Sequence, residues 1–286
     1  MQTKIRVELQ NIRENFNLHS RGSDWWNASN ESYVKAFSET FGSDSISVDL
    51  GGLEVVIPSV SFGAVTSVDL FGLDELIIFS FYQANKDRYS RVADLGANIG
   101  LHSLVLAAMG MTVTAYEPDP KHTAIARRVL SHPDISALVT WIEKAVVPNS
   151  KSTPEIEFVR VVGNTTSSHV AGAKSAPYGD LETFSVKTES LQDIAEKAQL
   201  IKMDVEGLEA DLLESLSGPS FEGTDFMLEV GTSENAERIF NLGSNLGINL
   251  FSQKTNWNLV KTLRDVPVGY KEGSLFATKK AGMNWG

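Results

Sequence analysis

The middle of the chain, from about residue 71 to 232, alternates two hydrophobic patterns. Short apolar runs typical of buried strands are followed by segments in which apolar residues recur every three or four positions, as in helices. The strand candidates are residues 91–95, 112–116, 139–142, 200–203 and 225–230, and the helix candidates are residues 74–82, 101–109, 120–130 and 208–216. This alternation predicts an α/β fold, with a parallel sheet covered by helices on both faces.

The N-terminal region, residues 1–70, follows a different pattern. Gly51-Gly52 stands between the β-rich runs 45–50 and 53–58 and predicts a hairpin closed by a two-residue turn. Earlier in the region, Trp25-Trp26 is expected to anchor a helix to the core, and an apolar wall for a substrate or a partner subunit is the alternative. We expect this region to be an extension that caps the substrate site.

The remaining chain, residues 71–286, is expected to form one cofactor-binding domain. Its last part predicts a helix at 235–246 and strands at 248–252 and 274–278. The alternation is interrupted at residues 149–190, which are rich in Ser, Thr, Gly and Asn and carry two short β-like runs. An insertion of this length is uncommon in an α/β domain unless it covers a site. We therefore expect a flap or substrate loop, with an idle surface loop as the alternative.

Composition narrows the function classes. The chain has 286 residues, of which 42% are apolar, enough for one large α/β domain with a real core. It has no cysteine, which excludes disulfides and thiolate metal sites. A net charge of −11 argues against broad nucleic-acid binding, which depends on many Lys and Arg contacts to phosphate. No apolar run is long enough to span a membrane and no secretory signal pattern is present, so we expect a cytoplasmic enzyme.

The segment from Asp94 to Gly100, Asp-Leu-Gly-Ala-Asn-Ile-Gly, follows the first strand of the alternating region. Glycines at such a strand end let the backbone approach a ligand, and the next helix offers its free N–H groups. Dinucleotide sites favour G-x-G-x-x-G, whereas Asn98 occupies the second glycine position here, which disfavours a nicotinamide enzyme. An acid ahead of the glycines suits S-adenosylmethionine, which has an ammonium, a sulfonium and no phosphate. We therefore expect Asp94, Gly96, Ala97, Asn98 and Gly100 to bind that cofactor.

Two further acidic positions follow strand candidates. Glu117 ends the second strand, 23 residues after Asp94, where an acid can accept hydrogen bonds from both ribose hydroxyls. The apolar run 200–203 leads directly into Asp204-Val205-Glu206-Gly207 and then into a helix. Carboxylates at the carboxyl ends of strands lie where open α/β sheets bind ligands. The sequence therefore predicts acids at two strand ends of one site.

Taken together, residues 94–100, Tyr116-Glu117-Pro118, Lys144-Ala145 and residues 201–209 resemble the FkbM family of S-adenosylmethionine-dependent O-methyltransferases. The resemblance covers roughly residues 75–232. It implies a class I methyltransferase fold, a three-layer sandwich whose seven-stranded sheet has the order 3-2-1-4-5-7-6, with only strand 7 antiparallel. It also implies an enzyme that methylates a hydroxyl group of a sugar, glycan or secondary metabolite.

By position in the family's motifs, the resemblance implies that the glycine turn holds the cofactor and that Glu117 holds its ribose. Lys144 and Ala145, after the third strand, would border the adenine. Because lysine cannot accept a hydrogen bond from the adenine amino group, we expect the contact of Lys144 to come from its backbone. Asp204 would line the methionine end, near the reacting methyl group.

Methyl transfer from a sulfonium is an in-line displacement, so the enzyme must align the acceptor oxygen and, for an alcohol, remove a proton. The candidate catalytic residues are Asp204 and Glu206 after the fourth strand, Glu229 after the fifth, His102 in the first turn of the helix behind the glycine turn, and His169 in the insertion. Glu206 could instead be an ordinary turn residue and Glu229 a satisfied core carboxylate, and each histidine could be a packed one. His122 and His132, which bracket a helix, are expected at the surface.

Acids at these strand tips also suit Mg²⁺, which favours oxygen ligands. Glu229 is followed by Val230-Gly231 and not by a second ligand, so we expect no metal site and keep Mg²⁺ as the alternative. The sequence also leaves open methylation of nitrogen or of a nucleic-acid 2′-hydroxyl by the same fold, and a non-catalytic module that binds the cofactor. The expected partner is a small-molecule or glycan hydroxyl acceptor. Neither its identity nor the oligomeric state follows from the sequence.

Overall fold

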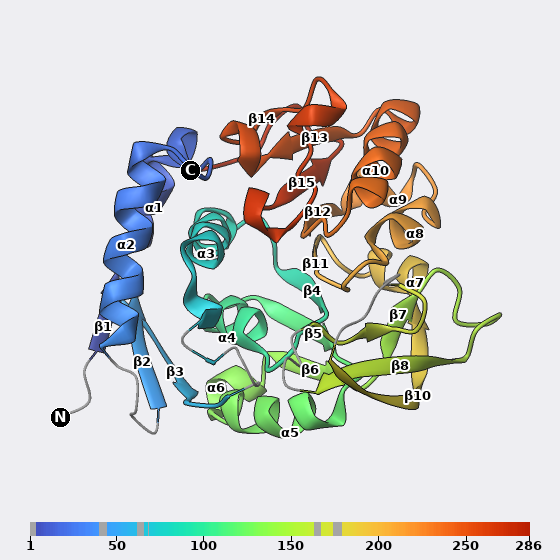
Figure 1. The fold of residues 1–286 in the computed structure, drawn as a ribbon, viewed down its shortest axis with the longest axis horizontal. Helices are drawn as coiled ribbons and strands as arrows, with labels where there is room; N and C mark the ends of the chain where they lie inside the picture. The colour runs from blue at the N-terminus through green and yellow to red at the C-terminus, as the bar shows by residue number, and fades with distance from the viewer. Residues whose placement is uncertain (1–3, 40–44, 62–65, 68, 163–166, 174–178) are drawn as a thin grey trace.

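The computed structural model of the chain describes residues 4–39, 45–61, 66–67, 69–162, 167–173 and 179–286. Within them, the largest sheet has eight strands in the order β14-β13-β15-β12-β11-β4-β5-β6 (Figure 1). The strands are β4 (Arg91–Leu95), β5 (Thr112–Tyr116), β6 (Val139–Ile142), β11 (Leu200–Met203), β12 (Asp225–Leu228), β13 (Asn249–Ser252), β14 (Asn258–Leu259) and β15 (Leu275–Thr278). Neighbours from β6 to β12 run parallel, and β15 is antiparallel to both of its neighbours.

Seven of these strands reproduce the order expected from the family resemblance. From β6 to β13 they correspond to 3-2-1-4-5-7-6, and the antiparallel strand is β15, as expected for strand 7. The class I methyltransferase fold is therefore confirmed. The expected number of strands is wrong by one in the described chain, because β14 pairs with β13 as a short hairpin at the sheet edge.

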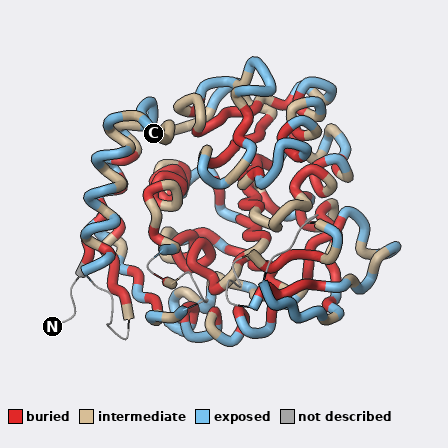
Figure 2. The backbone as a smooth tube through the Cα atoms, in the orientation of Figure 1, coloured by how far each residue is buried: buried red, intermediate tan, exposed pale blue. Residues whose placement is uncertain are grey.

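Helices lie on both faces of this sheet (Figure 1). They are α3 (Leu73–Asn85), α4 (Leu101–Ala108), α5 (Pro120–Val129), α6 (Pro133–Ser136), α7 (Leu191–Ala195), α8 (Glu209–Glu214), α9 (Ser220–Gly223) and α10 (Ser233–Leu246). The side chains of β4 alternate between the faces: Val92 belongs to the hydrophobic cluster with α3 and α4, whereas Ala93 and Leu95 belong to the cluster with α7, α8 and α10. α3 is buried on most of its surface, because it packs between the sheet and the N-terminal helices (Figure 2).

The predicted helices and strands of the central region are all present, each within three residues of its expected bounds. The short elements α6, α7 and α9 were not predicted, because four or five residues carry too little periodicity to be recognised. Single 3₁₀ turns complete the described elements: η1 (Phe16–Leu18), η2 (Asp69–Phe71), η4 (Gln253–Thr255), η5 (Leu263–Asp265) and η6 (Tyr270–Glu272). Among the helices that the structure describes, none has the length and apolar character needed to cross a membrane.

The N-terminal extension forms a second, smaller sheet. It consists of β1 (Lys4–Val7), β2 (Ser45–Leu50) and β3 (Leu53–Pro58), with α1 (Leu9–Glu14) and α2 (Asp24–Ser38) packed beside it. The predicted hairpin is confirmed, since β2 and β3 are antiparallel and Gly51 and Gly52 form the turn with φ of 64° and 95°. Trp25 and Trp26 are partly buried against the main core, as the anchoring interpretation expects. Trp26 Nε1 also donates a hydrogen bond to Asp74 Oδ1 in the first turn of α3.

The insertion at residues 149–190 is a sheet and not a loop. In the described part of the chain it supplies β8 (Glu155–Val162), β9 (His169–Val170) and β10 (Asp180–Ser190), which join β7 (Ala145–Val147) in the order β7-β10-β8-β9. Its small apolar core, which includes Phe158, Val170 and Val186, packs against Leu208 beyond the end of β11. The insertion therefore lies at the carboxyl ends of the central strands (Figure 1).

Candidate functional site

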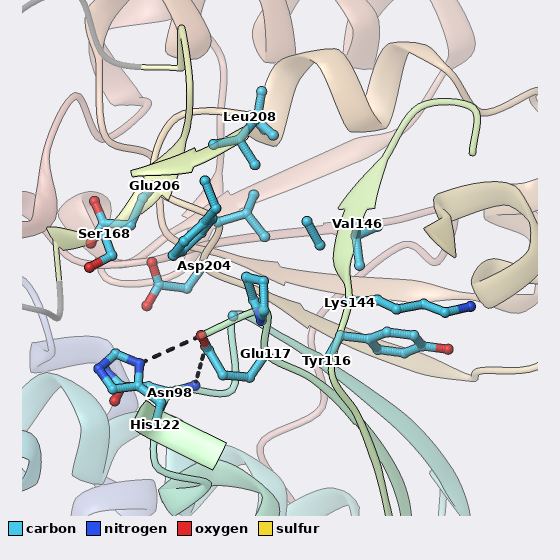
Figure 3. A pocket seen from close by; sticks show the side chains of 16 residues that line it. Asn98, Tyr116, Glu117, His122, Lys144, Val146, Ser168, Asp204, Glu206 and Leu208 are labelled. Atoms are coloured by element: carbon cyan, nitrogen blue, oxygen red, sulfur yellow. Dashed lines mark hydrogen bonds and ion pairs between the residues drawn. The ribbon is translucent and has the colours of Figure 1, made fainter. Parts of the chain in front are cut away.

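A pocket of about 590 Å³ lies at the carboxyl ends of β4, β5 and β11 (Figure 3). It is lined by Gly96, Asn98, Tyr116, Glu117, Pro118, His122, Lys144, Ala145, Val146, Phe158, Ser168, Val170, Asp204, Val205, Glu206 and Leu208. A second cavity of about 400 Å³ is lined by Leu70, Glu75, Gly96, Ala97, Asn98, Ile99, Leu101, His102, Lys202 and Asp204. Gly96, Asn98 and Asp204 line both, so the two cavities are the two ends of one site over the glycine turn.

The glycine turn is held between the ends of β5 and β11. The N–H groups of Gly96 and Ala97 both donate to the carbonyl oxygen of Tyr116, each at 3.0 Å. At Gly96 φ is 73°, and a Cβ atom there would lie 1.8 Å from the carbonyl oxygen of Asp204. Because this φ disfavours L side chains and backbone already occupies the space, only glycine fits. The neighbouring strand end thus requires glycine independently of any ligand.

Asn98 connects the glycine turn to the end of β5. It adopts a φ of 53°, and its N–H donates to Oε2 of Glu117 at 2.9 Å. Its side-chain Oδ1 is buried and accepts no hydrogen bond from the described residues. A buried acceptor without a donor is uncommon in native proteins, and here it borders both cavities. The position suits a donor group of a bound ligand.

Glu117 is fixed on the floor of the first pocket. Its Oε1 accepts from the N–H of Asp119 at 2.8 Å, while its Oε2 accepts from Asn98. Among the described residues, Asn98 is the one donor to Oε2, which therefore keeps acceptor capacity for a ligand hydroxyl. His122 Nδ1 lies 3.5 Å from Oε1 of Glu117. The side chains of Asn98, Glu117 and His122 lie together at one end of the pocket (Figure 3).

His122 is a correction to the expectation from sequence, which placed it at the surface. Its side chain is only 4% exposed and lines the first pocket. Burial lowers the pKa of His122, but the hydrogen bond and charge of Glu117 outweigh burial and raise the pKa above its usual value. The sequence contained one signal for this position: His122 is in the first turn of α5, which begins three residues after Glu117.

Asp94 lies beneath the cavities and not in their walls. It is fully buried, its Oδ2 accepts from the Ser103 hydroxyl at 2.7 Å, and its Oδ1 lies 3.8 Å from Nζ of Lys202. Neither cavity is lined by Asp94. The residue therefore orients α4 through Ser103 and offsets the charge of Lys202, and its expected contact with a cofactor stays a prediction. Gly100, with φ of 85°, begins α4 and packs against Leu130 and Trp141 below the turn.

The insertion forms one wall of the first pocket, through Phe158, Ser168 and Val170. It is tied to the Glu117 segment by Arg160, whose Nε and Nη2 donate to the two carboxylate oxygens of Asp119 at 2.7 and 2.6 Å. Arg160 and Asp119 are both buried, so this bidentate pair fixes the insertion against the end of β5. This contact favours the flap interpretation over an idle surface loop.

Lys144 and Ala145 line the first pocket, and their expected position beside the adenine stays a prediction. The Lys144 side chain points away from Glu117, and its Nζ forms an ion pair with Glu189 at 2.7 Å (Figure 3). The ammonium of Lys144 therefore forms its ion pair outside the pocket, and the backbone of Lys144 is the part that faces the pocket. Ala145 begins β7 and is held by its register with Thr188 of β10.

Charged side chains gather at the second cavity because of the strand register. Lys202 of β11 is paired in register with Asp94 of β4, and side chains two residues apart on a strand share one face. Asp204 therefore follows Lys202 on that face. Glu229 lies beside Asp204, since its N–H donates to the carbonyl oxygen of Met203 at 3.0 Å. The Nζ of Lys202 is 3.4 Å from Asp204 Oδ2.

These charges shift one another's titration. Burial lowers the pKa of Lys202, but the surrounding carboxylates, Asp204 foremost, outweigh burial and raise it, so Lys202 is charged. The carboxylate of Asp204 raises the pKa of Glu229 well above its usual value, and burial, Glu75 and Glu206 add to this, against the opposite effect of Lys202. The cluster consists of mutually repelling acids around one ammonium.

His102 lies at the second cavity, held at both ring nitrogens. Its Nε2 is 2.7 Å from Oε2 of Glu75, in the first turn of α3, and its Nδ1 is 3.0 Å from the Tyr82 hydroxyl. Burial raises the pKa of Glu75, but His102 outweighs it and lowers the pKa overall. His169 is buried in β9, with Nδ1 3.0 Å from the carbonyl oxygen of Ser167, and lines neither cavity.

Glu209 holds the loop that carries Asp204 and Glu206 in place through hydrogen bonds. Oε1 of Glu209 accepts from the N–H groups of Val205 and Gly207 at 3.3 and 3.1 Å. Its Oε2 accepts from the Asn235 side chain at 2.7 Å. The loop also includes Glu206 in the left-handed region, with φ of 57°, and Glu206 lines the first pocket. Glu209 is therefore a structural part of the motif.

Glu75 and Lys202 are site residues that were not identified from the sequence. Lys202 had a usable signal, because a charged residue inside a buried strand run is nearly always paired. Glu75 had none, because α3 belongs to a different segment and only the packed fold brings it to Lys202. Within the described residues, no group of three or more His, Asp or Glu side chains could hold a metal ion.

The residues present fit S-adenosylmethionine. The first pocket offers an apolar cleft with a fixed carboxylate, Glu117, which suits a nucleoside with two ribose hydroxyls. The second cavity is lined by two carboxylates, those of Glu75 and Asp204, and by the ammonium of Lys202, which suits the ammonium, sulfonium and carboxylate of the methionine part. The free Oδ1 of Asn98 lies between them.

Comparison with known proteins gives the same result. A family model for the methyltransferase FkbM domain matches residues 94–242, just over half of the chain. No protein with a curated description matches the chain by sequence. The matched span contains the glycine turn, Glu117 and the Asp204 loop.

Solved structures with similar folds are distant. A SAM-dependent methyltransferase from Agrobacterium tumefaciens is 14% identical, with a TM-score of 0.45 over 83% of this chain and 71% of that one. The C-terminal domain of precorrin-6Y C5,15-methyltransferase from Rhodobacter capsulatus is 13% identical, with a TM-score of 0.39 over 77% and 92% of the two chains. Because the family match covers more than half of the sequence, the chain belongs to the FkbM family of S-adenosylmethionine-dependent methyltransferases.

Proposed function

We propose that this methyltransferase transfers a methyl group to a hydroxyl of a sugar, glycan or secondary metabolite. The observation that carries the proposal is the carboxylate of Asp204 at the tip of β11, which lines both cavities and has Glu229, at the tip of β12, as its neighbour. An alcohol must lose a proton when its oxygen is methylated, and these acids offer acceptors for it. A cytoplasmic location remains a prediction.

The first pocket is proposed to hold the adenosine part of the cofactor. Glu117 would accept hydrogen bonds from the two ribose hydroxyls, since both of its oxygens are already aligned by backbone N–H groups. Val146 and Phe158 offer apolar walls for the adenine, and Lys144 and Ala145 would border its edge through their backbones. The unpartnered Oδ1 of Asn98 supports a ligand donor at the glycine turn.

The second cavity is proposed to hold the methionine part. The bound cofactor supplies a methyl group on a positively charged sulfur. The acceptor must approach the methyl carbon along the S–CH₃ axis, from the side opposite the sulfur. Asp204 and Glu75 would hold the ammonium, and Lys202 would face the carboxylate. Alignment of the two reacting atoms can lower the barrier by roughly 7–11 kcal/mol in favourable cases, so these residues act mainly by position.

The other candidate residues differ in how well their surroundings suit proton removal. His102 has both ring nitrogens within hydrogen-bond distance of Tyr82 and Glu75, which supports a positioning role for it. Glu206 lines the first pocket and faces the same rim as Asp204. His169 lies within the insertion and away from both cavities, so the proposal assigns it no step.

An acceptor screen with methyl-labelled S-adenosylmethionine tests the proposal. The full chain is offered sugars, glycans and polyhydroxylated metabolites, each paired with its amino analogue. We expect label in the hydroxyl acceptors as methyl ethers, and label confined to the amino analogues would contradict the proposal. In the Asp204→Asn variant, turnover should fall about 10²–10⁴-fold while calorimetry still detects S-adenosylhomocysteine. Asp134→Asn, at a highly exposed aspartate, is the matched control.

A further inference from the structure

The first turn of α3 connects the second cavity to the N-terminal extension. Its residues Asp74 and Glu75 are neighbours on the helix, where successive side chains point about 100° apart. Glu75 points toward the cavity, which it lines together with His102 and Lys202. Asp74 points instead toward the extension and toward the 3₁₀ turn that follows β13. A single turn of helix therefore makes contacts with both regions.

The carboxylate of Asp74 accepts four hydrogen bonds, two at each oxygen. Oδ2 accepts from Nε of Arg21 at 2.8 Å and also from its Nη2. Oδ1 accepts from Nε1 of Trp26 at 3.2 Å and from Nε2 of Gln253 at 2.5 Å. These donors use the full acceptor capacity of a carboxylate. Asp74 is therefore bonded wholly within the protein and has no acceptor left for a ligand.

Gln253 is held in place independently of Asp74. Its side chain is fully buried, and its Oε1 accepts from the N–H of Ser274 at 3.0 Å. Its Nε2 also lies 3.3 Å from the carbonyl oxygen of His19 in the extension. Gly273 packs so closely against this side chain that a Cβ atom there would lie 2.4 Å from Cδ of Gln253. Gln253 therefore gives Asp74 a rigid partner that belongs to the C-terminal part of the sheet.

The first turn of α3 depends on these bonds because it has no side-chain cap. Its N-cap residue is Gly72, which offers no side chain to the free N–H groups at the helix start. Uncapped helix ends fray readily. Asp74 instead holds the turn through partners outside the helix. Glu75 follows directly, with its Oε2 2.7 Å from Nε2 of His102, so its place at the cavity depends on the turn being fixed.

We propose that Asp74 is a positioning residue for the methionine end of the site. It fastens the first turn of α3 to Arg21, Trp26 and Gln253, and thereby holds the Glu75 carboxylate where it meets the ammonium of the bound cofactor. The N-terminal extension contributes to cofactor binding in this way through residues that line neither cavity. This role rests on the proposed function, because it uses the placement of the methionine part beside Glu75.

A double-mutant cycle tests whether Asp74 acts through Glu75. Calorimetry measures the affinity for S-adenosylmethionine in the wild-type chain, Asp74→Asn, Glu75→Gln and the double variant. Asp74→Asn keeps one acceptor oxygen but loses the ionic bond to Arg21, so affinity should fall about three- to tenfold. In the Glu75→Gln background the same change should cost less than about twofold, because the carboxylate that Asp74 positions is already gone. A change that only weakened the fold would reduce affinity equally in both backgrounds.

Arg21→Met gives a second route to the same answer, and it decides the question if Asp74→Asn does not fold. It removes both donors of a partly exposed side chain and leaves the bonds of Asp74 to Trp26 and Gln253 in place. We expect affinity to fall about two- to threefold, and this loss should again disappear in the Glu75→Gln background. Circular dichroism at the assay temperature establishes which variants are folded.

Asp87→Asn is the matched control, since it makes the same change at an exposed residue just beyond the other end of α3. It should leave the affinity unchanged. Equal losses in the two backgrounds, or full affinity in Asp74→Asn, would overturn the positioning role and leave the proposed function intact. Full affinity in Glu75→Gln would instead contradict the placement of the methionine part in the proposed function.

Discussion

The two ends of the site are built on different principles. At the adenosine end, one carboxylate, Glu117, is locked by the backbone N–H groups of Asn98 and Asp119 and surrounded by apolar walls. At the methionine end, Lys202 stands among acids that come from α3, β4, β11 and the tip of β12. In the proposed function, the first end would bind the ribose through its two hydroxyls. The second end would respond to charge, because its four carboxylates outnumber the single ammonium of Lys202.

This difference assigns different tasks to the two ends. A rigid acceptor fixed by backbone bonds contributes nearly equally to binding the cofactor before and after methyl transfer, because the ribose does not change. A cluster of acids would discriminate between the two forms, because only the substrate form carries a sulfonium. Weaker binding of the neutral product than of the charged substrate would favour product release after methyl transfer.

Substitution of Gly96, one of the three residues that line both cavities, should have the largest effect. In Gly96→Ala the new Cβ would lie 1.8 Å from the Asp204 carbonyl oxygen at a φ of 73°. Strain at this φ and displacement of β11 together should cost about 3–5 kcal/mol of stability, and binding of S-adenosylhomocysteine should be lost. Denaturant unfolding and calorimetry measure the two effects.

Gly110→Ala is the control for that experiment. Its φ is 90°, yet nothing lies within 4 Å of the added Cβ, so the change reports the backbone strain alone. We expect it to cost about 1–2 kcal/mol and to leave ligand binding intact. If Gly96→Ala proved no more destabilising than Gly110→Ala, the close packing of the turn against Asp204 would be ruled out.

Neutralising one acid at each end tests the comparison directly. Glu117→Gln replaces an oxygen that faces a backbone N–H with an amide N–H₂, so affinity for both S-adenosylmethionine and S-adenosylhomocysteine should fall about 10–100-fold. The ratio of the two affinities should stay the same. Glu75→Gln should weaken S-adenosylmethionine by about fivefold more than S-adenosylhomocysteine, a charge effect on the order of 1 kcal/mol. Equal losses of both ligands in Glu75→Gln would refute the division of tasks.

The sequence predicted one of these ends better than the other. The glycine turn and Glu117 lie within 25 residues of each other, and strand, turn and acid follow in a fixed local order. The packing of Glu75 against His102 joins α3 and α4, and only the fold determines it. The eighth strand β14 has two residues, too few for an alternating pattern. His122 was wrongly expected at the surface. The helix pattern shows which face of α5 is apolar, but it does not show that His122 packs beside Glu117 at the end of β5.

The smallest effect is expected from His122, the titratable neighbour of Glu117. Because Glu117 raises the pKa of His122 in the folded chain, the protonated ring stabilises the fold. That contribution is fully present below the unfolded pKa of about 6.5 and is lost as the pH rises through the folded pKa. The thermal unfolding temperature of the wild-type chain should therefore exceed that of His122→Gln most at pH 6, and the difference should shrink toward pH 9.

His132→Gln removes an exposed histidine beyond the other end of the same helix and corrects for the loss of a titrating ring. A wild-type advantage over His122→Gln that grew with rising pH would mean that His122 is buried in its neutral form. Glu117 would then be held by its two backbone N–H groups alone, and the adenosine end would contain no ionic interaction. The contrast between the two ends would then be larger. Backbone hydrogen bonds alone would fix Glu117 at the adenosine end, and interacting charged side chains would define only the methionine end.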